Sequence, residues 1–202
     1  MKQIILDIES RPNPKLEEMF FEGIKAPKNI KDKEKIKANI EEQKKGAKKD
    51  MAVDIDYSEI ICIGVKDVGG ESKQISLEEF SDILEDVSKG NARLITYNGK
   101  NFDIPILVRA CLKFSNSNYL YNVRFLNSLR NKYNISSYHI DLFEELNNFG
   151  KWKSLDELCR IYVGGGKEEI DFNTATDEEI IKHNGECLSH TEKLYKFFEP
   201  IL

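Results

Sequence analysis

Two carboxylates stand two residues apart near the N-terminus, where the apolar run Gln3–Ile8 ends. In a β-strand this spacing puts Asp7 and Glu9 on the same face, where their charges repel unless a cation or a base lies between them. A strand that has simply reached solvent could carry the same pair, so the pair alone is a weak signal. If a cation does lie there, carboxylate ligands favour Mg²⁺ or Mn²⁺.

A third carboxylate, Asp103, follows another apolar strand candidate, Arg93–Tyr97, within the stretch Asn98–Leu107. An acid at the start of a helix also stabilises the helix dipole, and this is the alternative explanation of Asp103. Three carboxylates at strand ends are, however, what two divalent ions require for phosphodiester hydrolysis. One ion prepares a water molecule, and both stabilise the attacking and leaving oxygens. The three acids together predict a metal-dependent phosphodiesterase site.

The elements that must position these acids are strands in the first half of the chain and helices in the second. Apolar runs predict strands at Gln3–Ile8, Ile60–Val65, Lys73–Ile75 and Arg93–Tyr97. Capping sequences with a glutamate three residues later predict helix starts at Ser76, Asp141, Ser154 and Thr176. This order predicts an α/β fold with a sheet flanked by helices, in a single domain over residues 1–202.

A long insertion, about residues 11–57, separates the first two strands, and Lys31–Lys49 within it predicts a polar helix. Residues 25–49 hold ten lysines against four acids and carry a charge of +6, although the whole chain carries −5. An anionic partner could therefore bind there despite the net acidity. The alternative is a solvated helix whose charges serve solubility. The candidate contacts to nucleic acid are Lys44, Lys45, Lys48 and Lys49.

The composition argues against several classes of protein. With 40% apolar and 32% charged residues of mixed sign, the chain is not expected to be disordered. No apolar run reaches the roughly 18 residues that span a bilayer, and the acidic N-terminus does not resemble a signal peptide. The four scattered cysteines, without a CxxC pair, argue against a disulfide framework and a structural zinc site. We expect a reduced, cytoplasmic, soluble protein without a membrane partner.

The segments Asp7-Ile-Glu9 and Asn98-Gly-Lys-Asn-Phe-Asp103-Ile-Pro105 resemble the first two motifs of the DEDD 3′–5′ exonuclease superfamily. The chain is most similar to the predicted exonucleases related to the proofreading domain of family B DNA polymerases. In those proteins, segments like His139–Leu142 and Ser154–Glu157 follow in the same order. The resemblance implies a ribonuclease H-like mixed β-sheet and two Mg²⁺ or Mn²⁺ ions. It also implies hydrolysis at the 3′ end of single-stranded DNA or RNA, with a DNA polymerase or a repair complex as protein partner.

The resemblance implies a role for each matching position. Asp7 would bridge both ions, Glu9 would hold the ion on the nucleophile side, and Asp103 would support the second ion. Asn98 and Phe102 would shape the pocket for the terminal nucleotide. Phe102 would do so by stacking on a base, although ordinary core packing explains a phenylalanine there equally well.

The third motif departs from the family pattern of Tyr or His followed by Asp on the last helix. The register set by Thr191 and Leu194 puts His183 at the Tyr or His position and Cys187 at the position of the fourth carboxylate. His183 and Cys187, at i and i+4, share one helix face. The near-neutral pKa of a histidine suits a general base, whereas a thiol is a poor ligand for Mg²⁺. Glu186 is adjacent in sequence, but one helix position rotates it by about 100° off that face.

The remaining histidines and cysteines have structural interpretations. We expect His139 to steady the turn into the helix that follows it, and His190 to lie at the surface. Cys62, Cys111 and Cys159 are interpreted as small core residues.

Three functional hypotheses follow from these patterns. The first is a metal-dependent 3′–5′ exonuclease whose activity is weakened by Cys187. The second is a catalytically impaired nucleic-acid-binding module that keeps the exonuclease fold. The third is an α/β interaction protein whose acids are surface charge, and the motif from Asn98 to Pro105 argues against it. Metal binding beside Asp7 and Glu9, with nuclease activity in Mg²⁺ or Mn²⁺, distinguishes the first two.

Overall fold

The centre of the molecule is a mixed five-stranded β-sheet, in a computed structural model that describes residues 1–113, 120–131, 137–147, 152–166, 170–172 and 174–202. The strand order is β3-β2-β1-β4-β5. β1 pairs antiparallel with β2 and parallel with β4, which confirms the predicted α/β fold with a mixed sheet. The strands are β1 (Lys2–Pro12), β2 (Ser58–Asp67), β3 (Ser72–Ile75), β4 (Ala92–Thr96) and β5 (His139–Asp141).

Two features of the strands differ from the sequence-based expectation. β1 continues past Ile8 to Pro12, beyond an irregularity in its pairing with β2 between Glu9 and Ser10. A proline is tolerated at such a strand end because one ladder hydrogen bond is lost only at the margin of the sheet. The sequence also does not predict β5, because three residues are too few to show alternation. β5 forms by parallel pairing with β4 at the edge of the sheet.

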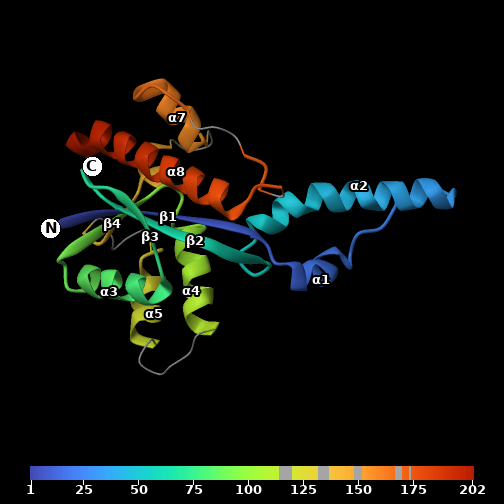
Figure 1. The fold of residues 1–202 in the computed structure, drawn as a ribbon, viewed down its shortest axis with the longest axis horizontal. Coiled ribbons are helices and arrows are strands. Elements are labelled where there is room, and N and C mark those ends of the chain that lie inside the picture. The colour runs from blue at the N-terminus through green and yellow to red at the C-terminus, as the bar shows by residue number, and fades with distance from the viewer. Residues whose placement is uncertain (114–119, 132–136, 148–151, 167–169, 173) are drawn as a thin grey trace.

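Helices cover both faces of the sheet (Figure 1). On one face lie α3 (Leu77–Ser88), α4 (Asp103–Lys113) and α5 (Leu120–Ser128). On the other face lie α7 (Leu155–Tyr162) and α8 (Asp177–Phe198). The short helix α6 (Leu142–Leu146) directly follows β5 in the chain. Leu6 of β1 packs in the core cluster of the first face, whereas Ile5 packs in the cluster that contains Leu188 of α8. Because side chains alternate along a strand, Asp7 and Glu9 share the face of Ile5 and point toward α8.

The predicted caps begin the helices as expected. Side-chain oxygens of Ser76, Asp141, Ser154 and Thr176 each accept a backbone N–H from the first helical turn. Each such cap stabilises its helix by about 1 kcal/mol, so these short-range signals define where the helices start. None of the described helices is long and apolar enough to cross a membrane.

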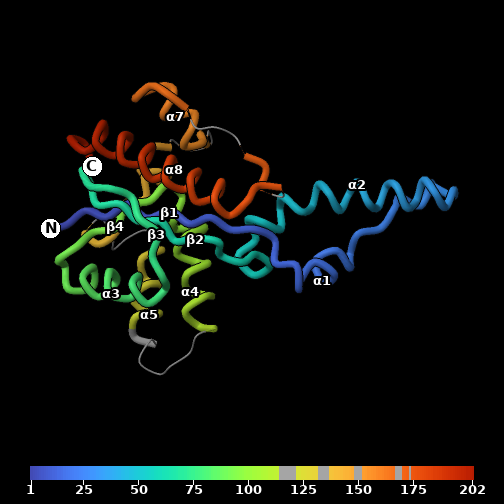
Figure 2. Tube along the Cα trace, in the orientation of Figure 1, coloured from blue at the N-terminus to red at the C-terminus, as the bar shows by residue number. Residues whose placement is uncertain are grey.

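The residues between β1 and β2 form an arm that projects away from the sheet (Figures 1 and 2). It holds α1 (Glu17–Phe21) and α2 (Lys33–Ala52), and two short 3₁₀ helices lie at Pro14–Leu16 in this arm and at Glu199–Ile201 near the C-terminus. α2 begins at Asp32, whose carboxylate accepts the backbone N–H groups of Glu34 and Lys35. At its other end the hydroxyl of Ser10 donates to the carbonyl of Ala52 over 2.6 Å. The last turn of the lysine-rich helix is therefore held beside the end of β1.

The two histidines outside the predicted site are both buried. The ring of His139 contacts the Thr96 hydroxyl at 2.8 Å and the Leu129 carbonyl at 3.0 Å, and burial lowers its pKa to about 4. His190 is only 8% exposed, so the expectation of a surface position was wrong. α8 packs between the sheet and α7, and a helix covered on two sides buries more than the single stripe that periodicity reveals. Cys62 and Cys159 are buried and Cys111 is half-buried.

Candidate active site

The half-buried Asp7 and the buried Asp103 form a carboxylate pair where β1 runs past the end of β4. The pairing of β1 with β4 ends at Ile5, and Asp103 is the first residue of α4. Asp103 is 3% exposed, and burial, followed by the charges of Asp7 and Asp141, raises its pKa well above the usual value. Among the described residues, its Oδ1 atom has no hydrogen-bond partner. A divalent cation would stabilise such a pair, because it would satisfy this oxygen and offset the repulsion.

The loop that delivers Asp103 is held by Asp141 at the end of β5. The carboxylate of Asp141 accepts the backbone N–H of Asn98 at 2.7 Å and that of Lys100 at 2.8 Å. Asn98 has a φ of 67°, which asparagine tolerates better than most residues, and a Cβ on Gly99 would lie 2.4 Å from the Thr96 hydroxyl. The Asn-Gly pair of the motif therefore has a structural reason, because it shapes the turn that begins α4.

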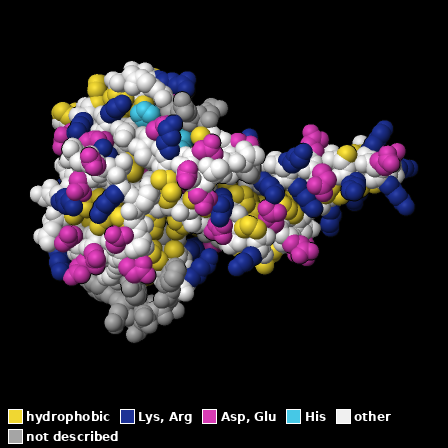
Figure 3. Space-filling view, viewed as in Figure 1, with side chains coloured by type: hydrophobic (Ala, Val, Ile, Leu, Met, Phe, Trp, Pro, Cys, Tyr) yellow, Lys and Arg dark blue, Asp and Glu magenta, His cyan; other side chains and the backbone are white. Residues whose placement is uncertain are grey.

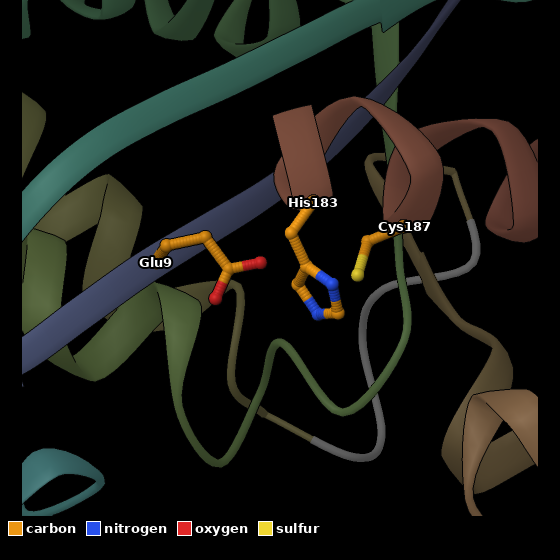
Figure 4. Close-up of side chains that lie close together, drawn as sticks. All are labelled: Glu9, His183 and Cys187. Carbon is orange, nitrogen blue, oxygen red and sulfur yellow. The ribbon is translucent and has the colours of Figure 1, made fainter. Parts of the chain in front are cut away.

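A second group of potential ligands lies on the α8 side of β1 (Figure 4). One ligand atom from each of Glu9, His183 and Cys187 lies within 4.8 Å of the other two. His183 and Cys187 are 6% and 3% exposed and come from successive turns of α8. Of the residues that the structure describes, no other acid, histidine or cysteine completes a group of this kind. The fold thus brings together residues from the two ends of the chain.

Asn184 is a site residue that the sequence analysis missed. It is fully buried, and its Nδ2 donates to the side-chain Oδ2 of Asp7 at 2.8 Å and to the Asp7 carbonyl at 3.2 Å. Its Oδ1 accepts from Gln74 of β3 at 3.0 Å. Asn184 therefore ties the end of β1 to β3 and orients the Asp7 carboxylate. The sequence offers only a weak signal for this role, namely a polar residue next to His183.

We expect Gly64→Ala to destabilise the protein by about 1–3 kcal/mol. The added Cβ would lie 1.7 Å from Asn184 Oδ1 and 2.9 Å from Leu188 Cδ1, so Asn184 would have to leave Asp7. Gly46→Ala in α2 is the matched control, because nothing lies within 4 Å of its added Cβ. That control should hold or raise the stability, by up to about 1 kcal/mol. Urea denaturation measures both variants, and equal midpoints for the two would contradict the packing described for Asn184.

A pocket of about 710 Å³ opens beside the Glu9–His183–Cys187 group. Glu9 and His183 line it, together with the rings of Phe102 and Phe172 and with Lys49 from the end of α2. The ring of Phe172 packs edge to face on the imidazole of His183, with centroids 5.5 Å apart. The pocket thus combines acid, imidazole, aromatic and cationic groups. Phe172 and its loop were not predicted, because nothing local in the sequence connects them to α8.

Two other predicted residues lie outside the lining of this pocket. The side-chain oxygen of Asn98 accepts from Asn101 Nδ2 at 2.8 Å, so the role of Asn98 in substrate binding stays a prediction. The carboxylate of Glu186 lies 3.8 Å from Lys182 Nζ on the outer side of α8, and its side chain is 32% exposed. Glu186 is not part of the group formed by Glu9, His183 and Cys187.

The four candidate lysines of α2 fall into two pairs. Lys48 forms an ion pair with Glu17 at 2.8 Å, and Lys44 lies 3.9 Å from Glu41. Lys45 and Lys49 are exposed, and within the described parts of the chain neither has a carboxylate within 4.0 Å. Lysine and arginine side chains are spread along the projecting arm (Figure 3). The arm thus offers uncompensated positive charge at the pocket and next to it.

The two groups of ligands suit different cations. The oxygens of Asp7 and Asp103 fit a hard ion such as Mg²⁺ or Mn²⁺. The second group offers a nitrogen and a sulfur beside the Glu9 carboxylate, and this donor set fits Mg²⁺ poorly. The residues present therefore fit one hard divalent ion well and a second one only in part.

Comparisons with known proteins agree with the fold and with the predicted family. A family model described as a predicted 3′–5′ exonuclease related to the exonuclease domain of PolB matches residues 52–178, a stretch that includes Asp103 but neither β1 nor most of α8. In structure, the chain is similar to the family B DNA polymerase from the hyperthermophilic archaeon Pyrobaculum calidifontis. The TM-score is 0.58 at 13% identity, over 99% of this chain and 25% of the polymerase chain, so this likeness shows the fold alone. No match was found among curated proteins.

Proposed function

This chain belongs to the family of predicted 3′–5′ exonucleases related to the exonuclease domain of PolB, and from this premise we propose that it is a divalent-metal-dependent 3′–5′ exonuclease of single-stranded DNA. One observation supports the proposal above the others. The half-buried Asp7, whose charge acts on the buried Asp103 of α4, lies two residues from Glu9 on β1, and Glu9 lines a pocket that also holds His183 and two aromatic rings.

Each group of the pocket has a distinct task in this proposal. Asp7, Glu9 and Asp103 would hold the cations, and bound cations would supply activation of a water molecule and stabilisation of the attacking and leaving oxygens of the phosphodiester. His183 accepts a proton from water or orients it. The faces of Phe102 and Phe172 stack on the terminal base, as aromatic residues do in single-strand binding proteins. Lys49 attracts the phosphate backbone toward the pocket.

A degradation assay tests this function. The substrates are single-stranded DNA and RNA oligonucleotides labelled at the 5′ end, incubated in Mg²⁺, in Mn²⁺ or in EDTA. We expect a ladder that shortens stepwise from the 3′ end of DNA in the presence of metal and no change in EDTA. A ladder on RNA alone would move the substrate to RNA. Intact DNA and RNA in both metals would contradict the proposal.

A catalytically impaired binding module is the second candidate, favoured by one specific observation. The thiol of Cys187 stands in the group with Glu9, at the position where the resemblance to the exonucleases implies a carboxylate. Fluorescence anisotropy with the same oligonucleotides distinguishes the two candidates. Binding without degradation in either metal supports the module, whereas degradation supports the exonuclease.

The lysine pairs of α2 give a charge-matched test of the substrate path. We expect Lys45→Gln combined with Lys49→Gln to weaken single-strand binding. The slope of log affinity against log salt concentration should decrease in magnitude by about 1.4, that is, by about 0.7 for each lost phosphate contact. Lys44→Gln combined with Lys48→Gln removes the same charge. Its effect should be smaller, because these lysines already face Glu41 and Glu17. If the two double variants show equal slopes of log affinity against log salt, the lysine-rich arm is a solvated helix that does not contact the substrate.

A further inference from the structure

The Glu9–His183–Cys187 group offers three different donor atoms around one point. A carboxylate oxygen, an imidazole nitrogen and a thiol sulfur lie within 4.8 Å of one another. In Figure 4 the imidazole of His183 stands between the carboxylate of Glu9 and the sulfur of Cys187. This is a mixed donor set, which in proteins suits transition metals rather than Mg²⁺ or Ca²⁺.

We propose that Glu9, His183 and Cys187 bind Zn²⁺. Tetrahedral zinc with bonds of about 2.0–2.3 Å places its ligand atoms about 3.3–3.6 Å apart. Starting from separations of up to 4.8 Å, each donor atom has to move by less than about 1 Å to reach that geometry. Rotations of the three side chains can supply such a movement without a change in the backbone.

Two of the three ligands are held by a single rigid element. His183 and Cys187 stand four residues apart on α8, a spacing that presents two side chains of a helix to the same ion, as in helical zinc motifs. α8 is fastened beside β1 by Asn184, whose amide binds Asp7 two residues from Glu9. Glu9 is therefore the only ligand that the fold has to bring from another element.

The site leaves one coordination position for a water molecule or a substrate oxygen. Three protein ligands with a fourth open position are the arrangement of catalytic rather than structural zinc sites. Glu9 and His183 both line the 710 Å³ pocket, so a zinc ion held by these residues would be close to the space in which a substrate would lie. The zinc site shares Glu9 and His183 with the site of the proposed function, and a His183 that holds zinc through the nitrogen facing Glu9 and Cys187 does not accept a proton there. Zinc binding can still be measured without nucleic acid, so the two proposals are tested separately.

Cobalt provides the direct test of this site. Untagged, metal-free protein in a non-thiol reductant is titrated with Co²⁺, which gives a sulfur-to-cobalt charge-transfer band in the near ultraviolet and strong visible bands when it is tetrahedral. We expect both signals to saturate at a single equivalent, to disappear when Zn²⁺ is added and to persist in a large excess of Mg²⁺. The absence of the sulfur band in the wild-type protein would overturn the proposal.

Cysteine variants show which sulfur binds the metal. Cys187→Ser should abolish the sulfur-to-cobalt band and weaken Zn²⁺ binding by about 100-fold or more, beyond the loss seen for residues that only support a metal ligand. Cys62→Ser is the matched control, because Cys62 is a buried thiol directly opposite Glu9 on β2 and should keep the band. Loss of the band in Cys62→Ser but not in Cys187→Ser would overturn the assignment.

A second variant serves if Cys187→Ser does not fold. Glu9→Gln keeps the shape of the side chain and should weaken Zn²⁺ binding while the sulfur band survives at high Co²⁺. Unchanged Zn²⁺ affinity in this variant would exclude Glu9 from the site.

Failure of this proposal and failure of the proposed function give different results. A sulfur-to-cobalt band without nuclease activity in any metal retains the zinc site and removes the exonuclease. Mg²⁺-dependent degradation without the band retains the exonuclease and removes the zinc site.

Discussion

Asp7→Ala is expected to lower divalent-dependent nuclease activity by about 10³-fold or more. Metal ions supply several kcal/mol of transition-state stabilisation in phosphoryl transfer, and about 4 kcal/mol corresponds to a factor of about 10³. We expect the largest effect at Asp7, because its charge helps to raise the pKa of the buried Asp103 and its carboxylate is oriented by Asn184. The initial rate of single-strand degradation in Mg²⁺ and in Mn²⁺ measures the loss.

Two companion variants separate chemistry from folding. Asp7→Asn keeps an oxygen that can accept from Asn184, and it should be as inactive as Asp7→Ala. In EDTA, Asp7→Asn should also melt at a higher temperature than the wild-type protein. The reason is that the charge of Asp7 no longer opposes ionisation of the buried Asp103. Asp67→Asn is the control and should keep full activity. This exposed acid lies at the far end of β2, and within the described part of the chain its carboxylate forms an ion pair with Lys2 alone. Substantial metal-dependent activity in Asp7→Ala would remove Asp7 from the site.

Cys187→Asp is expected to accelerate degradation in Mg²⁺ by tenfold or more, a factor that corresponds to about 1.4 kcal/mol. The substitution replaces a sulfur by a carboxylate that faces Glu9, so the second group would then offer oxygens to a hard ion. The wild-type protein should depend more strongly on Mn²⁺ than the variant does, because Mn²⁺ tolerates a softer set of ligands better than Mg²⁺. Cys187→Glu should help less, because its longer side chain has to fold back to reach the same point.

Glu186→Gln is the control for this gain of activity. The Glu186 carboxylate faces Lys182 on the outer side of α8, so we expect its removal to leave the wild-type rate nearly unchanged. If Glu186→Gln abolishes activity and Cys187→Asp gains little, Glu186 supplies the fourth ligand after a rearrangement of α8. If neither substitution changes the rate, this helix contributes no carboxylate to the metal site.

The sequence by itself determined the elements and the faces of the candidate site, because these depend on short-range patterns. Alternation along the first strand indicated that Asp7 and Glu9 share a face, and the structure directs that face toward α8. The spacing of His183 and Cys187 indicated one buried stripe on the last helix, and both are buried. Caps at Ser76 and Thr176 predicted helix starts, since a side chain three residues from its backbone partner needs no tertiary contact.

Only the tertiary structure decided which of these faces meet and at what distance. Glu9 and Cys187 are 178 residues apart in sequence, and no local period encodes their separation in space. The same holds for the Asn184 amide on Asp7, and for Lys49 reaching the pocket while Lys48 binds Glu17. Scattered cysteines argued against a structural zinc site, yet one of them joins Glu9 and His183 in a candidate metal site. These contacts form because α8 and the last turn of α2 pack against β1. The packing of distant elements depends on the shape of the whole core, and the pattern of a single segment does not encode that shape.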